Sequence, residues 1–319
     1  MKKFFLIGVF ALAFVSCKKE NAIEAKVAEV PMPEVKVKRY DKAFFEAKPE
    51  DLPKLKAEYP ELFPAGTEDT IWLSRMKEPF LLKLKGEVDK KYPDLDGLEE
   101  DLQVLFQHIK YYYPDFKTPK VVTLVTEDED AKAMYIPDVV AIPLSHYLGK
   151  DHEVYKGIDK YLVVNFEPSQ ILPDLVVSYA AQKVPPPTDR TFLSVMIYFG
   201  KKMYLKDVLL PEVSNADKMG YTEDQIKWSE ANEEGVWQYF ITNNLLFDTD
   251  AKLPQRFITP APFSKFYQEG DNQTPGRLGI YIGWQIVRSY MENNNVTLQE
   301  LLAKDANEIF DNSKYKPKK

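Results

Sequence analysis

The chain has 319 residues and a formal net charge of −7 at pH 7, with 49 acidic residues against 42 Lys and Arg. This acidic balance excludes a nucleic-acid-binding protein, because such proteins present a basic surface to the phosphates. Hydrophobic residues make up 45% of the chain and aromatic residues 13%. The chain can therefore bury a large core, and we expect one compact body.

The N-terminus predicts a lipoprotein signal. A basic start precedes an uncharged apolar run, residues 4–15. This run is too short to cross a bilayer, which needs about 20 apolar residues, and it is typical of a signal peptide. Residues 14–17, Phe-Val-Ser-Cys, resemble a bacterial lipobox, in which signal peptidase II cleaves before the cysteine. We predict that residues 1–16 are removed and that Cys17 carries acyl chains such as palmitate, which anchor the protein to a membrane.

Two segments follow the predicted anchor. Residues 17–34, the lipidated cysteine and a charged stretch with few large apolar side chains, are predicted to form a flexible tether. Residues 35–319 are predicted to form a single globular domain. Its first segment, residues 35–39, alternates apolar and basic side chains and is typical of a short edge strand.

The middle of the chain favours helices and then strands. Apolar side chains recur at helical spacing near the end of residues 49–112, which we predict to be mainly helical. Apolar and β-branched runs then predict strands, and Pro137-Asp138 between two of them suits the turn of a hairpin. The predicted strands are residues 120–126, 133–136, 139–142 and 161–165.

The C-terminal half favours helices. Thr222 and Gln225 have the spacing of a capping box at one helix start, and three consecutive prolines, residues 185–187, end another helix. The predicted helices are residues 172–184, 191–209, 223–244, 277–293 and 297–303. The predicted fold is α+β and predominantly helical, with a small N-terminal sheet and a helical C-terminal half.

Residue types that usually carry catalysis are sparse. His146 and His152 stand six positions apart and cannot form the i, i+4 pair of a zinc-binding H-E-x-x-H helix. The sequence contains no G-x-S-x-G, P-loop or G-x-G-x-x-G motif. Cys17 is the only cysteine, and its assignment to the lipid anchor excludes it as a nucleophile. We therefore expect no catalytic residue, no metal and no cofactor.

Two other classes of function stay open. Glu230 and Glu234 stand at i, i+4 in a predicted helix, and with His108 or His152 they could form a nonstandard zinc-peptidase site. A solvated helix face is the simpler explanation of these glutamates. A solute-binding lipoprotein is the second alternative, but it would consist of two similar α/β lobes, and the uneven distribution of predicted strands disfavours it.

The C-terminal part of the chain resembles a known family. Residues 274–291, TPGRLGIYIGWQIVRSYM, and residues 307–317, NEIFDNSKYKP, resemble the signature of the GldB family, gliding-motility lipoproteins of Bacteroidetes. The same segments are similar to a wider group of predicted zinc-peptidase-like proteins. The resemblance implies a zincin-like scaffold and a role in gliding motility linked to type IX secretion. It implies other gliding-motility or secretion proteins of the cell envelope as partners.

The resemblance also implies that catalysis has been lost. In the peptidase-like relatives a helix after the sheet carries H-E-x-x-H, and residues 172–183 match this helix. Ser178, Tyr179 and Gln182 stand at the positions of its first His, its Glu and its second His. A hydroxyl and an amide are poor zinc ligands, and a phenol cannot replace the carboxylate base. The chain is therefore expected to be a pseudo-metallopeptidase, a non-catalytic binding or structural component whose former cleft could hold a peptide.

Within residues 274–291, small and basic residues stand side by side. Arg277 and Arg288 are expected to pair with carboxylates such as Glu234. Three glycines recur at spacings of three and four residues and permit close approach of another helix or strand, which predicts a packing or cleft motif: Gly276, Gly279 and Gly283.

The residue after the predicted lipid anchor bears on localisation. Lys18 stands where lipoproteins retained in the inner membrane often carry Asp. We therefore expect a lipoprotein of the cell envelope, in the outer membrane and facing the periplasm.

Overall fold

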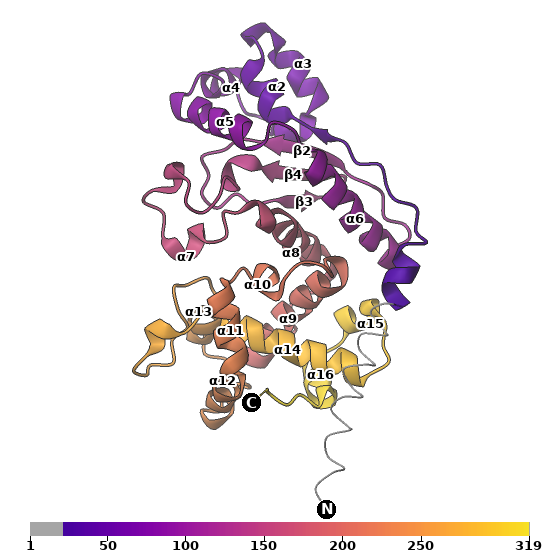
Figure 1. The fold of residues 1–319 in the computed structure, drawn as a ribbon, viewed down its shortest axis with the longest axis vertical. Coiled ribbons are helices and arrows are strands. Elements are labelled where there is room, and N and C mark those ends of the chain that lie inside the picture. Colours follow the sequence, from indigo (N-terminus) through magenta and orange to yellow (C-terminus); the bar gives the residue numbers. More distant parts are fainter. Residues whose placement is uncertain (1–21, 319) are drawn as a thin grey trace, which may run out of the picture.

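The computed structural model describes residues 22–318, and a mixed sheet lies in the middle of these residues (Figure 1). Its order is β1-β2-β4-β3, with β1, β2 and β4 parallel and β3 antiparallel to β4. The predicted edge strand and the predicted hairpin are therefore confirmed. The strands are β1 (Val37–Lys38), β2 (Lys120–Leu124), β3 (Met134–Ile136) and β4 (Val139–Pro143).

The sheet separates two hydrophobic clusters. Val121 and Val140, which are register partners, belong to the larger cluster, whereas the next residue in each strand, Val122 and Ala141, belongs to the smaller one. Successive side chains of a strand point to opposite faces, so β2 and β4 are buried on both sides. The larger cluster runs from the sheet into the C-terminal helices, which joins the two parts of the chain in one core.

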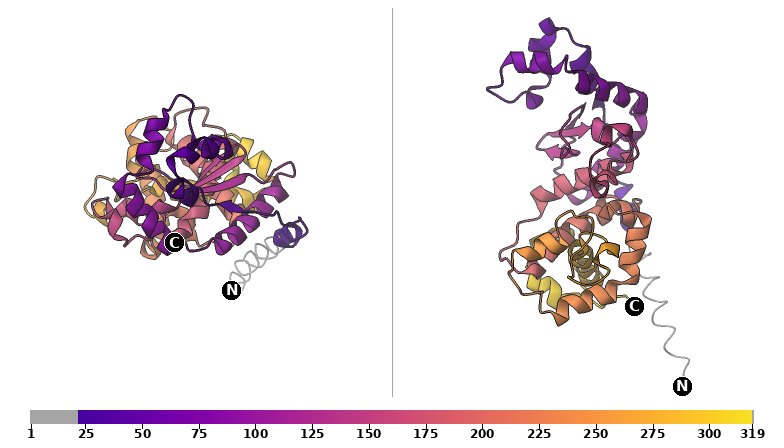
Figure 2. Two further views of the ribbon diagram at one scale, coloured as in Figure 1. Left: turned by 90° about the horizontal axis from the view of Figure 1, so that it is seen from above. Right: turned by 90° about the vertical axis from the view of Figure 1, so that its left-hand side faces the viewer.

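Helices form most of the described structure, so the prediction of an α+β, predominantly helical fold is confirmed. Helices α2, α3 and α4 contribute to the smaller cluster, on one side of the sheet, and α6 and α8 lie on the other side (Figures 1 and 2). Helix α5 contributes to the larger cluster. The predicted helical character of residues 49–112 is confirmed. These helices are α2 (Tyr40–Glu46), α3 (Leu52–Glu58), α4 (Asp69–Arg75), α5 (Pro79–Lys91) and α6 (Asp96–Tyr112), with the 3-10 turns η1 (Pro49–Asp51) and η2 (Pro60–Leu62).

Helices α9 to α16 form the opposite end of the molecule, and α8 lies between them and the sheet (Figure 1). The predicted capping box at Thr222 and Gln225 is present. Short helices that the sequence pattern missed complete this part, α10 and α13 among them. The helices are α7 (Lys160–Val163), α8 (Ile171–Lys183), α9 (Phe192–Leu209), α10 (Asn215–Met219), α11 (Glu223–Ala231), α12 (Glu233–Thr242), α13 (Lys252–Phe257), α14 (Leu278–Asn293), α15 (Leu298–Ala303) and α16 (Ala306–Ser313), with the 3-10 turns η3 (Leu144–His146), η4 (Glu153–Tyr155), η5 (Pro168–Gln170) and η6 (Asp271–Gln273).

Two predicted elements differ from the structure. Residues 161–165 do not form a strand. Residues 161–163 lie in the short helix α7, and the next two residues follow it directly. Their β-branched residues favour a strand, but tertiary packing overrides this preference. The predicted helix of residues 223–244 is broken at Asn232, which caps both α11 and α12.

The described part of the predicted flexible tether, residues 22–34, packs against α6. Residues 22–27 are helical, and Val27 is only 2% exposed. His108 Nε2 lies 3.1 Å from a carboxylate oxygen of Glu24, and Gln107 donates a hydrogen bond to the carbonyl oxygen of Val30. The prediction of a free tether is therefore wrong for these residues, because a buried valine and specific hydrogen bonds hold them on the body.

Among the helices of residues 22–318, none combines the length and the apolar character needed to cross a bilayer. The predicted signal peptide, residues 1–16, and the predicted lipidation site Cys17 lie outside the described residues.

Candidate functional site

Helix α14 carries most of residues 274–291 and packs tightly against α9. A Cβ built on Gly283 would lie 2.6 Å from the carbonyl carbon of Met196, and one built on Gly200 would lie 2.5 Å from the carbonyl carbon of Gly283. A Cβ on Gly279 would lie 2.9 Å from the carbonyl oxygen of Phe257. Gly279 and Gly283 therefore let backbones approach, which places them in close packing rather than in a cleft.

Arg288, near the end of α14, takes part in a largely buried polar network. Its guanidinium donates two hydrogen bonds of 2.7 Å to the two carboxylate oxygens of Asp207, and it lies 3.6 Å from the centre of the Trp284 ring. The indole of Trp284 also donates to Asp207, at 2.7 Å. The expected partner Glu234 is wrong, because Asp207 on α9 faces α14. This network holds the two helices together.

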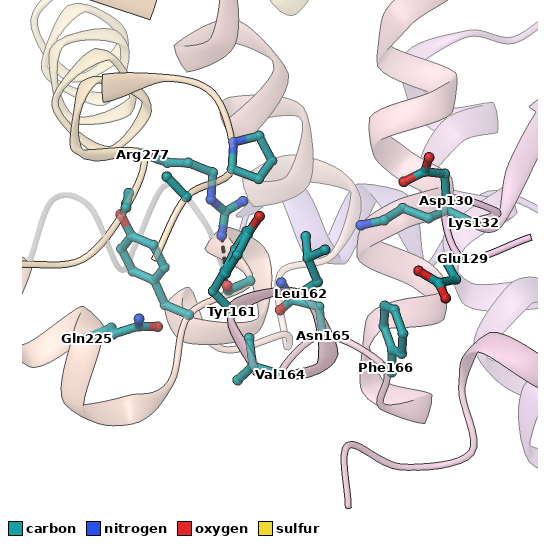
Figure 3. Close-up of a pocket in the computed structure, with 15 residues that line it drawn as sticks. Glu129, Asp130, Lys132, Tyr161, Leu162, Val164, Asn165, Phe166, Gln225 and Arg277 are labelled. Atoms are coloured by element: carbon teal, nitrogen blue, oxygen red, sulfur yellow. Dashed lines mark hydrogen bonds between the residues drawn. The ribbon is translucent and has the colours of Figure 1, made fainter. Parts of the chain in front are cut away.

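Arg277 directly precedes α14 and lines a pocket with Gly276. Figure 3 shows Arg277 on one side of the pocket and Lys132 reaching in from the other, with Tyr161 and Asn165 between them. The pocket has a volume of about 90 Å³. It is lined by residues of the loop between β2 and β3, of α7 and the turn after it, of the segment that leads into α11, and of the loops around 260 and 276.

The sequence assigned none of the other residues of this pocket to a binding site. Tyr161, Asn165 and Gln225 are neutral, and no pattern of binding residues includes them; Gln225 is part of the capping box at the start of α11. Asn165 lies in the run that the sequence pattern predicts to be a strand. The only signal that pointed to the pocket was the Gly276-Arg277 pair.

The helix matched to the peptidase motif, α8, is attached to the edge strand β3. Ser178 Oγ accepts a 2.9 Å hydrogen bond from the backbone N–H of Tyr135, and Gln182 Nε2 donates a 2.9 Å hydrogen bond to the carbonyl oxygen of the same residue. The two side chains therefore occupy the outward-facing backbone groups of Tyr135. A peptide cannot extend the sheet by pairing at this residue while these bonds are in place.

Tyr179, between Ser178 and Gln182, is packed in a cluster of aromatic rings. Its ring lies 5.1 Å from that of Tyr135 and 6.1 Å from that of Tyr113. It is 2% exposed, and burial raises the pKa of its hydroxyl. A buried phenol that holds its proton so firmly is not a general base. Within residues 22–318, no three His, Cys, Asp or Glu side chains are arranged to hold a metal ion.

Replacing Ser178 and Gln182 together with alanine is expected to lower the free energy of unfolding by about 1–2 kcal/mol, because two backbone groups of Tyr135 lose their partners. Urea denaturation of the mature protein measures this loss. Gln103→Ala on α6 is the matched control, because no hydrogen bond involves its side chain within the described residues. Equal stabilities of the double variant and the control would mean that α8 does not hold β3.

The residues of the alternative zinc site lie in different parts of the fold. Glu230 and Glu234 are on separate helices, because the chain breaks at Asn232. His108 contacts Glu24 on the N-terminal segment, and His152 lies 3.3 Å from a carboxylate oxygen of Glu87 on α5. The predicted i, i+4 pair of glutamates is therefore wrong. The third histidine, His146, is buried against a phenylalanine ring at 3.8 Å.

A comparison with protein-family models matches residues 20–317 to the family described as gliding motility protein GldB, whose name suggests a lipoprotein. The chain belongs to the GldB family. Comparisons with curated proteins and with solved structures find no match. The prediction of this family from residues 274–291 is confirmed, and the family makes the chain a gliding-motility protein.

In this GldB-family chain, residues 274–291 have two structural roles. The glycines and Arg288 dock α14 on α9, and Gly276 with Arg277 forms part of the pocket wall. The family match spans all of the helices and strands of Figure 1, so both roles lie inside the matched region.

Proposed function

We propose that this GldB-family protein is a cell-envelope lipoprotein that serves gliding motility as a non-catalytic binding or structural component, associated with the type IX secretion machinery. The family match over residues 20–317 carries the proposal. The lipobox-like residues 14–17 support an anchor at Cys17. Lys18 supports placement in the outer membrane, facing the periplasm, where the partners are other gliding or secretion proteins.

The chemistry of α8 supports the non-catalytic part of the proposal. In a zincin-like scaffold that has lost its metal, the helix of the peptidase motif still packs beside the sheet. The matched helix α8 lies along the antiparallel edge strand β3 (Figure 1). Ser178 and Gln182, at the positions of the two histidine ligands, use their polar atoms to bond the backbone of Tyr135. Such neutral side chains do not compete with His or carboxylate for zinc.

The N-terminal segment that packs against α6 limits the distance between the predicted lipid anchor and the body. Cys17 precedes Ala22, the first described residue, by 22 − 17 = 5 positions. Five residues span at most about 18 Å when fully extended. Because residues 22–27 are held at the C-terminal end of α6, the lipid would keep this end of the body close to the membrane.

Deleting the gene in a gliding host is expected to abolish colony spreading, and the wild-type gene is expected to restore it. Cys17→Ala is expected to fail, because the exported protein is no longer retained at a membrane. Immunoblots of membrane and soluble fractions would control for expression and release. Normal spreading after deletion would overturn the motility role, and stoichiometric zinc with chelator-sensitive peptidase activity in the purified protein would overturn the non-catalytic role.

A further inference from the structure

The fold fixes the direction of Arg277. Its φ is +61°, a left-handed conformation that non-glycine residues rarely adopt. Gly276 before it is held in place, because a Cβ there would overlap the carbonyl oxygen of Ala261 and because the hydroxyl of Tyr221 donates a hydrogen bond to the Gly276 carbonyl oxygen. Strain maintained by such surroundings is typical of functional positions. The side chain consequently lies against the pocket (Figure 3).

The charge of Arg277 has no carboxylate partner. A guanidinium has five N–H donors, and here one nitrogen, Nη2, donates to the carbonyl oxygen of Gly220 at 2.7 Å. The group also lies 5.4 Å from the ring centre of Tyr221. Within residues 22–318, no carboxylate oxygen lies inside the 4.0 Å ion-pair distance of Arg277. Burial lowers the pKa of this guanidinium, so its charge is poorly solvated.

Arg288, near the end of α14, is a useful contrast. Its role is structural, and a carboxylate of α9 neutralises its charge. Arg288 forms a two-point contact with Asp207, whereas Arg277 has no such partner. The carboxylate of Asp174 acts on Arg277 only from beyond the ion-pair distance and is itself paired with Lys132, and a second buried cation lies nearby.

This second cation, Lys206, is buried and donates to the carbonyl oxygen of Lys218. Burial lowers its pKa to about 7, while the charge of Asp174 raises this pKa and the charge of Arg277 lowers it. An anion in the pocket would give Arg277 the close counter-charge that it lacks.

The remaining walls of the pocket suit a small polar group. Tyr161 and Asn165 line it, and neither side chain forms a hydrogen bond with another described residue. Three exposed charged residues, Glu129, Asp130 and Lys132, lie at the opposite side from Arg277 (Figure 3). Water and salt screen these exposed charges more strongly than that of Arg277. The two acids also disfavour a polyanion.

We propose that this pocket binds a small ligand through one carboxylate or phosphate group, which Arg277 holds and which Tyr161 and Asn165 contact by hydrogen bonds. The volume of about 90 Å³ accommodates such a group. Arginine suits it, because its planar N–H donors match the oxygens of both anions. This proposal does not depend on the role in motility, the lipid anchor or the absence of catalysis.

The test is a titration of the mature protein with inorganic phosphate and, separately, with sodium acetate, at an ionic strength held constant with sodium chloride. Calorimetry and the thermal unfolding midpoint report binding. We expect saturable binding of at least one anion and a higher midpoint. Binding of phosphate alone or of acetate alone supports the proposal and identifies the anionic group. Arg277→Gln is expected to weaken binding at least about tenfold.

Two further variants make the test decisive. Arg190→Gln removes an equal charge from an exposed residue that does not line the pocket, and is expected to bind as the wild type does. Lys132→Gln changes an exposed side chain of the pocket and is expected to fold normally and to weaken binding about two- to threefold. If Arg277→Gln does not fold, the weaker binding expected of Lys132→Gln still tests the proposal. The absence of saturable binding of both anions, or unchanged binding in folded Arg277→Gln, would overturn the proposal.

Discussion

Gly283→Ala is expected to lower the free energy of unfolding by about 3 kcal/mol, at the upper end of the usual range for overpacking. The added Cβ would lie 2.6 Å from the carbonyl carbon of Met196 and 3.2 Å from its Cα. These are backbone atoms of α9 and cannot rotate away, so the two helices must separate. Ile282 and Trp284, both fully buried beside Gly283, would lose part of their packing.

Urea denaturation of the mature protein, followed by circular dichroism, measures this effect. Gly235→Ala is the matched control, since Gly235 lies inside α12, is exposed, and a Cβ there would meet no atom within 4 Å. That variant is expected to be more stable by about 0.5–1 kcal/mol, because alanine favours helix over glycine. A loss of stability no larger in Gly283→Ala than in the control would contradict the close contact of α9 and α14.

A double variant sharpens the result. Gly200 faces Gly283 from α9, and a Cβ on it would lie 2.5 Å from the Gly283 carbonyl carbon. Because either alanine forces the same two helices apart, the Gly200→Ala and Gly283→Ala losses should add up to more than the loss in the double variant. Additive losses would mean that the two glycines act at separate contacts.

Asp207→Ala is expected to destabilise the protein by about 3–5 kcal/mol, the cost of breaking a buried ion pair by removing one partner. Asp207 accepts hydrogen bonds from Arg288 and from the indole of Trp284, and its carboxylate lies 3.4 Å from the Lys218 amino group. The substitution leaves the Arg288 guanidinium with Asn215 as its remaining hydrogen-bond partner. Trp284 loses its acceptor in the core between α9 and α14.

The control is an exposed ion pair. Glu153 lies 3.1 Å from Lys83, and both side chains are more than half exposed. Glu153→Ala is expected to change the free energy of unfolding by less than about 1 kcal/mol. Urea midpoints at low and high salt should also differ between the pairs, because salt screens the exposed pair more. A loss below about 1 kcal/mol in Asp207→Ala would show that the network contributes specificity rather than stability.

Sequence patterns located most helices and the sheet because these signals are local. The capping box at Thr222 was found from two residues, and the hairpin from a turn between two apolar runs. Local signals gave a wrong prediction at residues 161–165, where β-branched residues indicated a strand but the chain forms the short helix α7 and the turn after it. They also failed at residues 22–34, whose polar composition suggested a tether although the segment is bound to α6.

The candidate site was only partly predictable. Residues 274–291 pointed to Gly276 and Arg277, which line the pocket, but no pattern indicated Tyr161 or Asn165. The sequence analysis expects Arg288 to pair with a carboxylate such as Glu234, whereas helix packing selects Asp207. A side chain's partner depends on which elements meet in space, and residue spacing along the chain carries little of that information.

By itself, the sequence determined the family, the α+β class, the absence of an H-E-x-x-H pair and the prediction of a lipid anchor at Cys17. Each of these depends on a motif, a composition or a local period. Only the tertiary structure decided that Ser178 and Gln182 bind the backbone of β3 and that Arg277 has no carboxylate within reach. These facts arise from contacts between segments far apart in the chain, where packing chooses the partner of each polar group.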